Sequence, residues 1–212
     1  INNKVSQYLG NGWSNEPLEK ENLITNKNLL TMTSGLNDES NLVIKPNLTY
    51  LADAGTRWSY SNVFQLLINV VSKASNQDFE TYFNAKLKNK IGMDGFWNYG
   101  TIFTIYHSNT RSMARFGLLF LNKGKWKNEQ IINENYVNET TNSSQDINPS
   151  YGYLCWLNGK SKYMVPGSQT VYPTALVPNA PSDMFSAMGA EDQRIYVIPS
   201  KNMVIVRMGD AS

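Results

Sequence analysis

Residues 25–36 read Thr25-Asn26-Lys27-Asn28-Leu29-Leu30-Thr31-Met32-Thr33-Ser34-Gly35-Leu36. Thr25 is a good N-cap because its hydroxyl can accept a hydrogen bond from a free backbone N–H of the first helical turn. Leu29 and Leu30 then form a short apolar face, and Gly35 is a favourable residue just past a helix end. The stretch therefore predicts one short helix that is followed by a tight glycine turn.

Amphipathic helices are expected between this stretch and residue 141. Two apolar series recur with the spacing of one helix face, namely Val63, Leu66, Leu67, Val70 and Val71, and then Phe79, Tyr82, Phe83 and Leu87. A third helix is expected over residues 111–121 and a short fourth one over about 133–141.

The period of the apolar residues changes to two after residue 150. We expect strands at residues 151–157, 185–188, 194–198 and 203–208, with a hairpin between the last two. The intervening segment 158–184 is long enough to be a functional flap. Helices first and strands last predict an α+β fold, with a mainly helical lobe over 1–150 and the strands of an antiparallel sheet over 151–212.

The composition excludes several functional classes. The 212 residues carry a formal charge of +2 with no basic run, so we expect no nucleic-acid partner. No apolar stretch approaches the roughly 20 residues of a membrane span. Cys155 and His107 are the only cysteine and histidine, and no Gly-rich phosphate loop or Gly-x-Ser-x-Gly motif is present. We therefore expect no metal and no cofactor, a buried Cys155, and a helix-entry or surface role for His107.

The segment Trp58-Ser59-Tyr60-Ser61-Asn62 lies directly before the first strong helix. Tyr60 and Asn62 are two residues apart where a loop meets a helix, so both side chains can face one cleft. A neighbouring lysine and the positive end of the helix dipole would lower the pKa of the Tyr60 phenol and make it a proton acceptor. The alternative is a plain loop in which Asn62 caps the helix.

Six segments, in the same order along the chain, resemble the serine β-lactamase and penicillin-binding-protein family, especially its class C branch. The opening stretch resembles the family's LLTHTSGL segment, and Tyr60-Ser61-Asn62 resembles its Tyr-x-Asn element. Lys90-Ile91-Gly92-Met93 resembles the family's PLGM segment, and Arg111 to Leu119 resembles its DLARFGLL segment. Tyr151-Gly152-Tyr153 with Trp156 resembles the YGYGWW segment, and Gly189 to Pro199 resembles the GxxGQxIxVxP segment. Within the family, the chain is most similar to the 6-aminohexanoate-dimer (nylon-oligomer) hydrolases and related esterases.

This resemblance implies a β-lactamase-like fold and a serine hydrolase that works through an acyl-enzyme. The nucleophile would be the serine of a Ser-x-x-Lys motif, with Tyr60 as proton shuttle and Asn62 as an anchor for the substrate or the lysine. The backbone N–H of Ala190, next to Gly189, would be an oxyanion donor. The implied substrate-binding residues are Trp58, Met188, Gln193, Tyr153 and Tyr163.

The chain departs from the family pattern at three places. No serine is followed three positions later by lysine, so we expect the nucleophile before Ile1, either on a separate chain or on a preceding part of the same protein. Ala187-Met188-Gly189 offers neither the cation nor the hydroxyl that holds the substrate carboxylate in penicillin-recognising enzymes, which favours uncharged amides or esters. Glu191 and Asp192 add negative charge, either favouring a cationic leaving group or standing as solvated turn residues.

The resemblance therefore predicts hydrolysis of a small-molecule or peptide-like amide or ester, in a protein that family analogy places in the periplasm or outside the cell. Two alternatives stay open. One is a D-alanyl-D-alanine carboxypeptidase or penicillin-binding homologue, and the other is a non-catalytic homologue that binds peptide or cell-wall fragments. The flap around Tyr163 is either a lid over the acyl pocket or an Ω-loop packed by its own side chains. Without its nucleophile the chain is expected to be inactive.

Overall fold

The computed structural model describes residues 1–210. Its elements form two compact units that interleave along the sequence. The first unit consists of Ile1–Tyr82, Asn98–Ile105 and Met164–Thr170, and the second of Phe83–Trp97, Tyr106–Tyr163 and the chain from Val171 onward. These units do not follow the division at residue 150 that the order of the elements suggested.

The first unit is built from short helices around one apolar core. Its helices are α1 (Ser6–Leu9), α2 (Leu18–Glu21), α3 (Asn26–Leu30) and α4 (Leu66–Ser75), with 3-10 turns η1 (Lys45–Asn47) and η2 (Asn62–Gln65). The helix α5 (Phe79–Phe83) leads from this unit into the second. The core consists of Val5, Ile24, Leu29, Leu36, Leu48, Val63, Leu66 and Val70. The apolar series that predicted the first strong helix thus spans η2 and α4.

The predicted helix after Thr25 is α3, and its start is confirmed in detail. The Thr25 hydroxyl accepts a hydrogen bond from the Asn28 N–H, and the Asn28 side chain accepts one from the Thr25 N–H at 2.9 Å. This reciprocal capping box satisfies two of the N–H groups that a helix start leaves without a partner. Leu29 on this helix is buried in the core, so the local cap also directs the chain into the fold.

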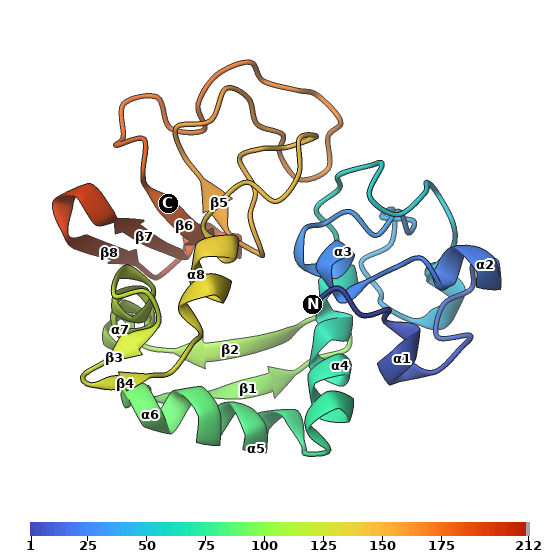
Figure 1. Ribbon diagram of the computed structural model, residues 1–212, viewed down its shortest axis with the longest axis horizontal. Helices are drawn as coiled ribbons and strands as arrows, with labels where there is room; N and C mark the ends of the chain where they lie inside the picture. Colours follow the sequence, from blue (N-terminus) through green and yellow to red (C-terminus); the bar gives the residue numbers. More distant parts are fainter. Residues whose placement is uncertain (211–212) are drawn as a thin grey trace. The chain divides into compact units, whose positions relative to one another are not determined.

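The second unit contains helices, one small hairpin and one sheet, and it shares another hairpin with the first unit (Figure 1). Its helical segments are the π-helical η3 (Asn84–Lys88), α6 (Asn89–Ile91), α7 (Thr110–Leu121) and α8 (Glu134–Thr140), with 3-10 turns η4 (Ala190–Asp192) and η5 (Pro199–Lys201). The sheet consists of β5 (Trp156–Leu157), β6 (Phe185–Met188), β7 (Arg194–Ile198) and β8 (Met203–Arg207). The hairpins are β3 (Lys125–Trp126) with β4 (Glu129–Gln130), and β1 (Gly95–Tyr99) with β2 (Thr104–Ser108), which crosses between the units.

The sheet is antiparallel throughout, in the order β5-β6-β7-β8, and α7 packs against it. Gly117 on α7 makes this packing possible. A Cβ at Gly117 would lie 2.6 Å from Val204 Cγ1 and 2.9 Å from Ile195 Cγ2, so any side chain would push the helix off the strands. The predicted α+β fold of helices against an antiparallel sheet is confirmed.

The predicted strand over residues 151–157 is mostly wrong. Only its last two residues belong to β5, because the chain folds back on itself just before them. The Gly152 N–H donates to the Cys155 carbonyl at 2.8 Å, and Leu154 has a φ of +51°. Tyr151 then pairs with Trp156 across this tight turn, so alternating apolar residues here come from a turn rather than an extended strand.

The sequence reasoning also missed the hairpin of β1 and β2 inside the expected helical region. A signal was present, because aromatic and β-branched residues flank Gly100 on both sides. Trp97 and Tyr106, one from each strand, pack edge-to-face against Phe83 at ring-centroid distances of 5.3 Å and 5.0 Å. The hairpin is therefore held by ring packing on one of its faces.

Candidate active site

The glycine turn of residues 31–36 is the platform for the segment 58–62 in the first unit. The Gly35 carbonyl accepts a hydrogen bond from the Ala52 N–H at 2.9 Å. Gly35 has a φ of +80°, and a Cβ there would lie 2.1 Å from the Ala52 carbonyl oxygen, so only glycine fits. The Met32 carbonyl in turn accepts from the Ser59 N–H at 2.9 Å. The platform therefore fixes the backbone in the middle of the segment.

The three predicted site residues of this segment, Trp58, Tyr60 and Asn62, lie together in the first unit. The Trp58 side chain is fully buried, and the backbone carbonyl of Trp58 accepts a hydrogen bond from Gln169 Nε2 at 3.1 Å. Asn62 is also buried and donates from Nδ2 to the Asn41 carbonyl at 2.9 Å. The backbone is therefore anchored on both sides of Tyr60.

The lowered pKa that we predicted for Tyr60 depends on a neighbouring lysine, and burial acts in the opposite direction. Burial raises the pKa of the phenol above its ordinary value. The Tyr60 ring centroid lies 6.3 Å from that of Phe64. The segment after Tyr60 begins with the short 3-10 turn η2, which has a smaller dipole than a long α-helix. Ser61, not Asn62, occupies the N-cap position, so the alternative of an Asn62 cap is wrong. The phenol keeps its proton at neutral pH in this environment.

In the second unit, β6 ends at Met188 and the chain turns sharply. The Gly189 N–H donates to the Gln193 carbonyl at 2.8 Å, and the Gln193 N–H donates to the Ala190 carbonyl at 3.2 Å. Ala190 is the first residue of the 3-10 turn η4, and the first N–H groups of a helical turn have no partner within it. The predicted residues Met188, Gly189, Ala190 and Gln193 thus form one strand end and its turn.

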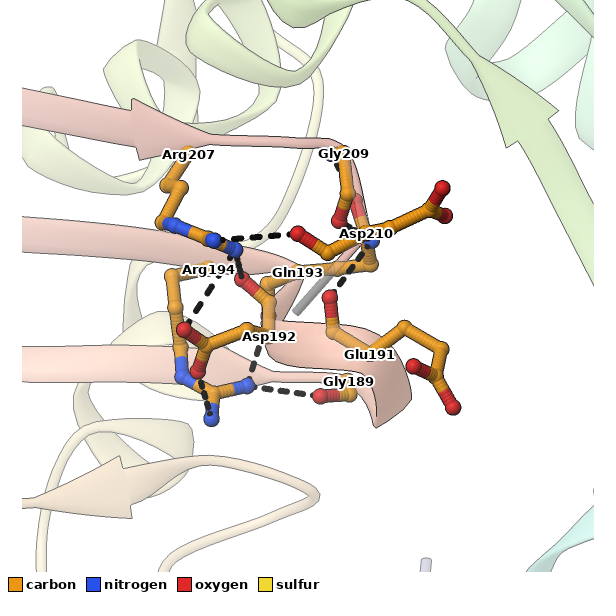
Figure 2. A network of polar contacts seen from close by, with 8 residues as sticks. All are labelled: Gly189, Glu191, Asp192, Gln193, Arg194, Arg207, Gly209 and Asp210. Carbon is orange, nitrogen blue, oxygen red and sulfur yellow. Dashed lines mark hydrogen bonds and ion pairs between the residues drawn. The ribbon is translucent and has the colours of Figure 1, made fainter. Parts of the chain in front are cut away.

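Two arginines hold this turn (Figure 2). Asp192 has a φ of +63°, a left-handed conformation that is unfavourable for a residue other than glycine. Its carboxylate pairs with Arg194 at 2.6 Å and with Arg207 at 3.3 Å. Arg194 also donates to the Gly189 carbonyl at 2.6 Å. Asp192 is therefore an exposed turn residue whose charge is paired with two guanidinium groups, which argues against a free negative charge for a cationic leaving group.

The sequence reasoning missed both arginines. Arg194 and Arg207 face each other across β7 and β8, where like charges repel unless an acidic group lies between them. Asp192, two residues before Arg194, is that group. An alignment of the two strands in register would therefore have revealed the two facing arginines and the acidic residue that pairs with them.

The Gln193 side chain ties the turn to the end of β8. Its Nε2 donates to the Gly209 carbonyl at 2.6 Å and to the Glu191 carbonyl at 2.9 Å, while its Oε1 accepts from the Gly209 N–H at 3.1 Å (Figure 2). An amide side chain can make such paired bonds to a backbone because it both donates and accepts. Gln193, predicted as a substrate-binding residue, therefore has a structural role in the described residues.

Tyr153 lines an apolar groove of the second unit with a volume of about 210 Å³. Other lining residues come from α7, α8, β6 and β7, among them Phe116, Phe120, Tyr136, Phe185 and Ile195. Burial, and after it the charge of Glu139, raise the pKa of Tyr153 to about 12. The Tyr153 hydroxyl donates to Glu139 Oε2 at 3.2 Å. Tyr153 thus faces an apolar surface and keeps its proton.

Tyr163 stands at the base of the flap. Its ring stacks on that of Tyr172 with the centroids 4.9 Å apart and the planes 14° apart. The two residues also exchange backbone hydrogen bonds of 3.0 Å and 2.9 Å, so the flap closes on itself at this point. That self-packing agrees with an Ω-loop.

His107 lies outside these groups of residues, whereas Cys155 lines the apolar groove together with Tyr153. His107 lies in β2, where its ring stacks on Phe96 at 5.3 Å, so it is a surface strand residue rather than a base. Cys155 is buried as predicted, and burial raises the pKa of its thiol to about 12. Within residues 1–210, no three His, Cys, Asp or Glu side chains are arranged to bind a metal ion, and no helix has the length and apolar character to cross a membrane.

The predicted site residues therefore form two separate groups. Trp58, Tyr60 and Asn62 lie in the first unit, and the turn after β6 lies in the second, together with Tyr153 and Tyr163. Each group is tied to its own unit by the hydrogen bonds described above. That the two groups face one another across a cleft stays a prediction of the family resemblance.

A family model described as Beta-lactamase matches residues 1–209. The chain belongs to the β-lactamase family. The match covers almost every residue, from before the platform to beyond the turn after β6, so the six resembling segments are parts of one continuous family domain. No curated protein resembles this β-lactamase-family chain closely enough in sequence to count as a match.

Solved structures share its fold at low sequence identity. A protein from Bacteroides dorei named as a β-lactamase has a TM-score of 0.70 at 15% identity, over 99% of this chain and 71% of that one. A protein from Bacillus anthracis named as a 6-aminohexanoate-dimer hydrolase has a TM-score of 0.69 at 16% identity, over 97% and 59%. A penicillin-binding-protein homologue from Caulobacter crescentus has a TM-score of 0.67 at 10% identity, over 96% and 68%. This β-lactamase-family chain thus spans between 59% and 71% of the length of these three proteins.

Proposed function

We propose that the chain is part of a serine hydrolase that cleaves an uncharged amide or ester through an acyl-enzyme. One observation carries the proposal. Tyr60 lies on a backbone segment that is anchored on both sides, by the Trp58 carbonyl and by the Asn62 side chain. Such an anchored segment suits a proton relay, because proton transfer in a transition state depends on a fixed donor position.

The nucleophile in this proposal lies outside residues 1–212, since the chain has no Ser-x-x-Lys. The serine oxygen attacks the substrate carbonyl and forms the acyl-enzyme bond while the bond to the leaving group breaks. The serine proton passes through the relay of the motif lysine and Tyr60 to the leaving group. Water then attacks the acyl-enzyme, returns a proton to the serine and releases the acid.

The raised pKa of Tyr60 defines its part in this relay. A buried phenol that keeps its proton at neutral pH is a donor first, so it is suited to protonating the leaving group. Ionising it requires a cation beside it, because an adjacent positive charge favours the phenolate. The motif lysine supplies that cation in our proposal.

The turn after β6 supplies the oxyanion donor in this proposal. The N–H of Ala190 begins the turn η4, and a first N–H of such a turn has no partner within the turn, so we assign it to the oxyanion. Gly189 and Gln193 fix the backbone on either side of it through the bonds at 2.8 Å and 3.2 Å. A donor that is held in place before the reaction stabilises the developing charge without reorganising.

The same strand end favours an uncharged substrate. Ala187-Met188-Gly189 has no cationic or hydroxyl side chain. The neighbouring guanidinium of Arg194 is occupied by Asp192 and by the Gly189 carbonyl. A substrate carboxylate therefore gains no charge-assisted hydrogen bond at this edge, whereas a neutral ester or amide loses nothing there.

Tyr60→Phe in the complete protein, with its Ser-x-x-Lys segment, tests the proposal. We expect kcat/KM for p-nitrophenyl butyrate to fall roughly 10²- to 10⁴-fold, because the variant keeps the ring and removes the transferable proton. The matched control is Tyr8→Phe. The Tyr8 hydroxyl accepts a hydrogen bond from Asn3 at 2.9 Å in the same unit, and its loss should leave kcat/KM unchanged.

A fall of less than about fivefold for Tyr60→Phe, with folding intact, would reassign Tyr60 to a structural role and favour a non-catalytic homologue. Residues 1–212 alone should not turn over the ester. Turnover that disappears when a serine within residues 1–212 is mutated would place the nucleophile inside the chain and overturn that part of the proposal.

A further inference from the structure

The carboxylate of Asp38 receives two side chains from the segment that leads to Tyr60. Arg57 Nη1 lies 2.8 Å from Asp38 Oδ2, and the Ser59 hydroxyl donates to the same oxygen. The side chain of Asp38 is 16% exposed and that of Arg57 is 24% exposed, so both groups are largely removed from water. Asp38 is 19 and 21 positions away from these partners in the sequence, and the contacts therefore join two separate loops.

The loop that carries Asp38, residues 37–47, is itself fixed to the first unit. The Asn37 N–H donates to the Thr49 carbonyl at 2.8 Å at the start of the loop. Near its end, Asn47 Nδ2 donates to Ser40 Oγ at 2.8 Å and to the Leu42 carbonyl at 3.1 Å. The loop that carries the Asp38 carboxylate is thus closed on itself by these hydrogen bonds.

Asp38 is ionised at neutral pH. Burial raises the pKa of its carboxyl, but the hydrogen bonds from Ser59 and Arg57 outweigh burial and hold the pKa below the usual value. An ionised carboxylate can accept both hydrogen bonds at once, and charge-assisted bonds are about twice as strong as neutral ones.

These contacts also hold the backbone next to Tyr60. Arg57 and Ser59 flank Trp58, and Ser59 directly precedes Tyr60, so both contacts to Asp38 fix the chain just before the phenol. On the far side of Tyr60, the Asn41 carbonyl of the same loop accepts the hydrogen bond from Asn62.

We infer that Asp38 is a positioning residue for Tyr60, which it holds in orientation through Arg57 and Ser59. The inference rests on the proposed proton-relay role of Tyr60. It assigns the 37–47 loop the task of keeping the phenol in line with the reacting groups, without contact between Asp38 and the substrate.

A double-mutant cycle in the complete protein tests the inference, because residues that act through one another give non-additive effects. Asp38→Asn should lower kcat for p-nitrophenyl butyrate roughly 10- to 100-fold with KM little changed, as expected for a misplaced relay group. In a Tyr60→Phe background the same substitution should lower kcat less than about threefold. Ser59→Ala, which removes one of the two contacts, is the second variant if Asp38→Asn does not fold.

The matched control is Asp53→Asn. Asp53 also accepts from a cation and a hydroxyl, Lys20 at 2.5 Å and Tyr50 at 3.0 Å, but it is exposed and lies outside the loop. This variant should leave kcat unchanged. An equal loss of kcat for Asp38→Asn in both backgrounds, or no loss in either, overturns the inference.

A second measurement separates this inference from the proposed function. With fluorotyrosine incorporated, the ¹⁹F resonance of residue 60 is the one that disappears in Tyr60→Phe. It should shift or broaden in Asp38→Asn and not in Asp53→Asn. If Tyr60→Phe keeps full activity, the proposed function fails, and the resonance still decides the inference, since an unchanged resonance in Asp38→Asn refutes it.

Discussion

Gln193→Ala isolates the contribution of the turn after β6, because the Gln193 side chain makes three hydrogen bonds that nothing else in the turn can replace. Nε2 donates to two carbonyls, at 2.6 Å and 2.9 Å, and Oε1 accepts a third bond at 3.1 Å. Each such bond contributes roughly 0.5–1.5 kcal/mol, and the low end applies at a partly exposed site. We therefore expect a loss of about 1.5 kcal/mol in the free energy of unfolding.

Gln130→Ala is a matched control for stability. Gln130 Nε2 donates to the Lys123 and Ile132 carbonyls at 2.8 Å and 2.6 Å, so it fixes another exposed turn of the same unit. Its loss should cost about 1 kcal/mol by the same reasoning. Urea denaturation of both variants checks that the two losses of stability are similar.

Activity should separate the two variants. Removing an oxyanion donor costs roughly 10²–10³ in kcat, and misplacing it costs less, so Gln193→Ala should lower the acylation rate of the complete protein about 10-fold or more. Stopped-flow hydrolysis of p-nitrophenyl butyrate measures this step. Equal activity in the two variants, at equal stability, would refute the oxyanion role of the turn.

Two further predictions concern substrate charge and pH. The complete protein should hydrolyse p-nitrophenyl butyrate well and nitrocefin poorly, because a carboxylate loses a contact that changes affinity roughly 10- to 150-fold; a higher kcat/KM for nitrocefin would mean that another cation holds its carboxylate. Burial and the charge of Glu21 raise the pKa of Glu16 from 4.5 to about 7, so its protonated form favours folding and stability falls as pH rises through that range. Glu16→Gln should therefore unfold at the same urea concentration as the wild type at pH 4 and be about 1 kcal/mol more stable than the wild type at pH 8. This free energy is smaller than the full pKa shift would give, because solvent screens the half-exposed carboxyl group.

Local patterns in the sequence determined most of the elements. The capping residues around α3, the apolar series of α4 and the period-two residues of β6 and β7 each depend on a few neighbours in the chain, so their backbone conformation can be predicted without the fold. The same holds for Tyr60 and Ala190, which were proposed from short segments. The failure at residues 151–157 shows the limit, because a tight turn at Leu154 gives the same alternation of apolar residues as a strand.

Only the tertiary structure determined which distant residues meet. Asp38 lies against Arg57 and Ser59 because the platform of residues 31–36 brings two loops together. Arg194 and Arg207 converge on Asp192 only after two strands are aligned in register. Such pairings depend on the path of the whole chain, and the pKa of a buried group such as Tyr60 depends on what that path places around it. For that reason the sequence predicted the identity of the candidate groups, whereas their partners and the direction of the pKa shift of Tyr60 came from the packed structure.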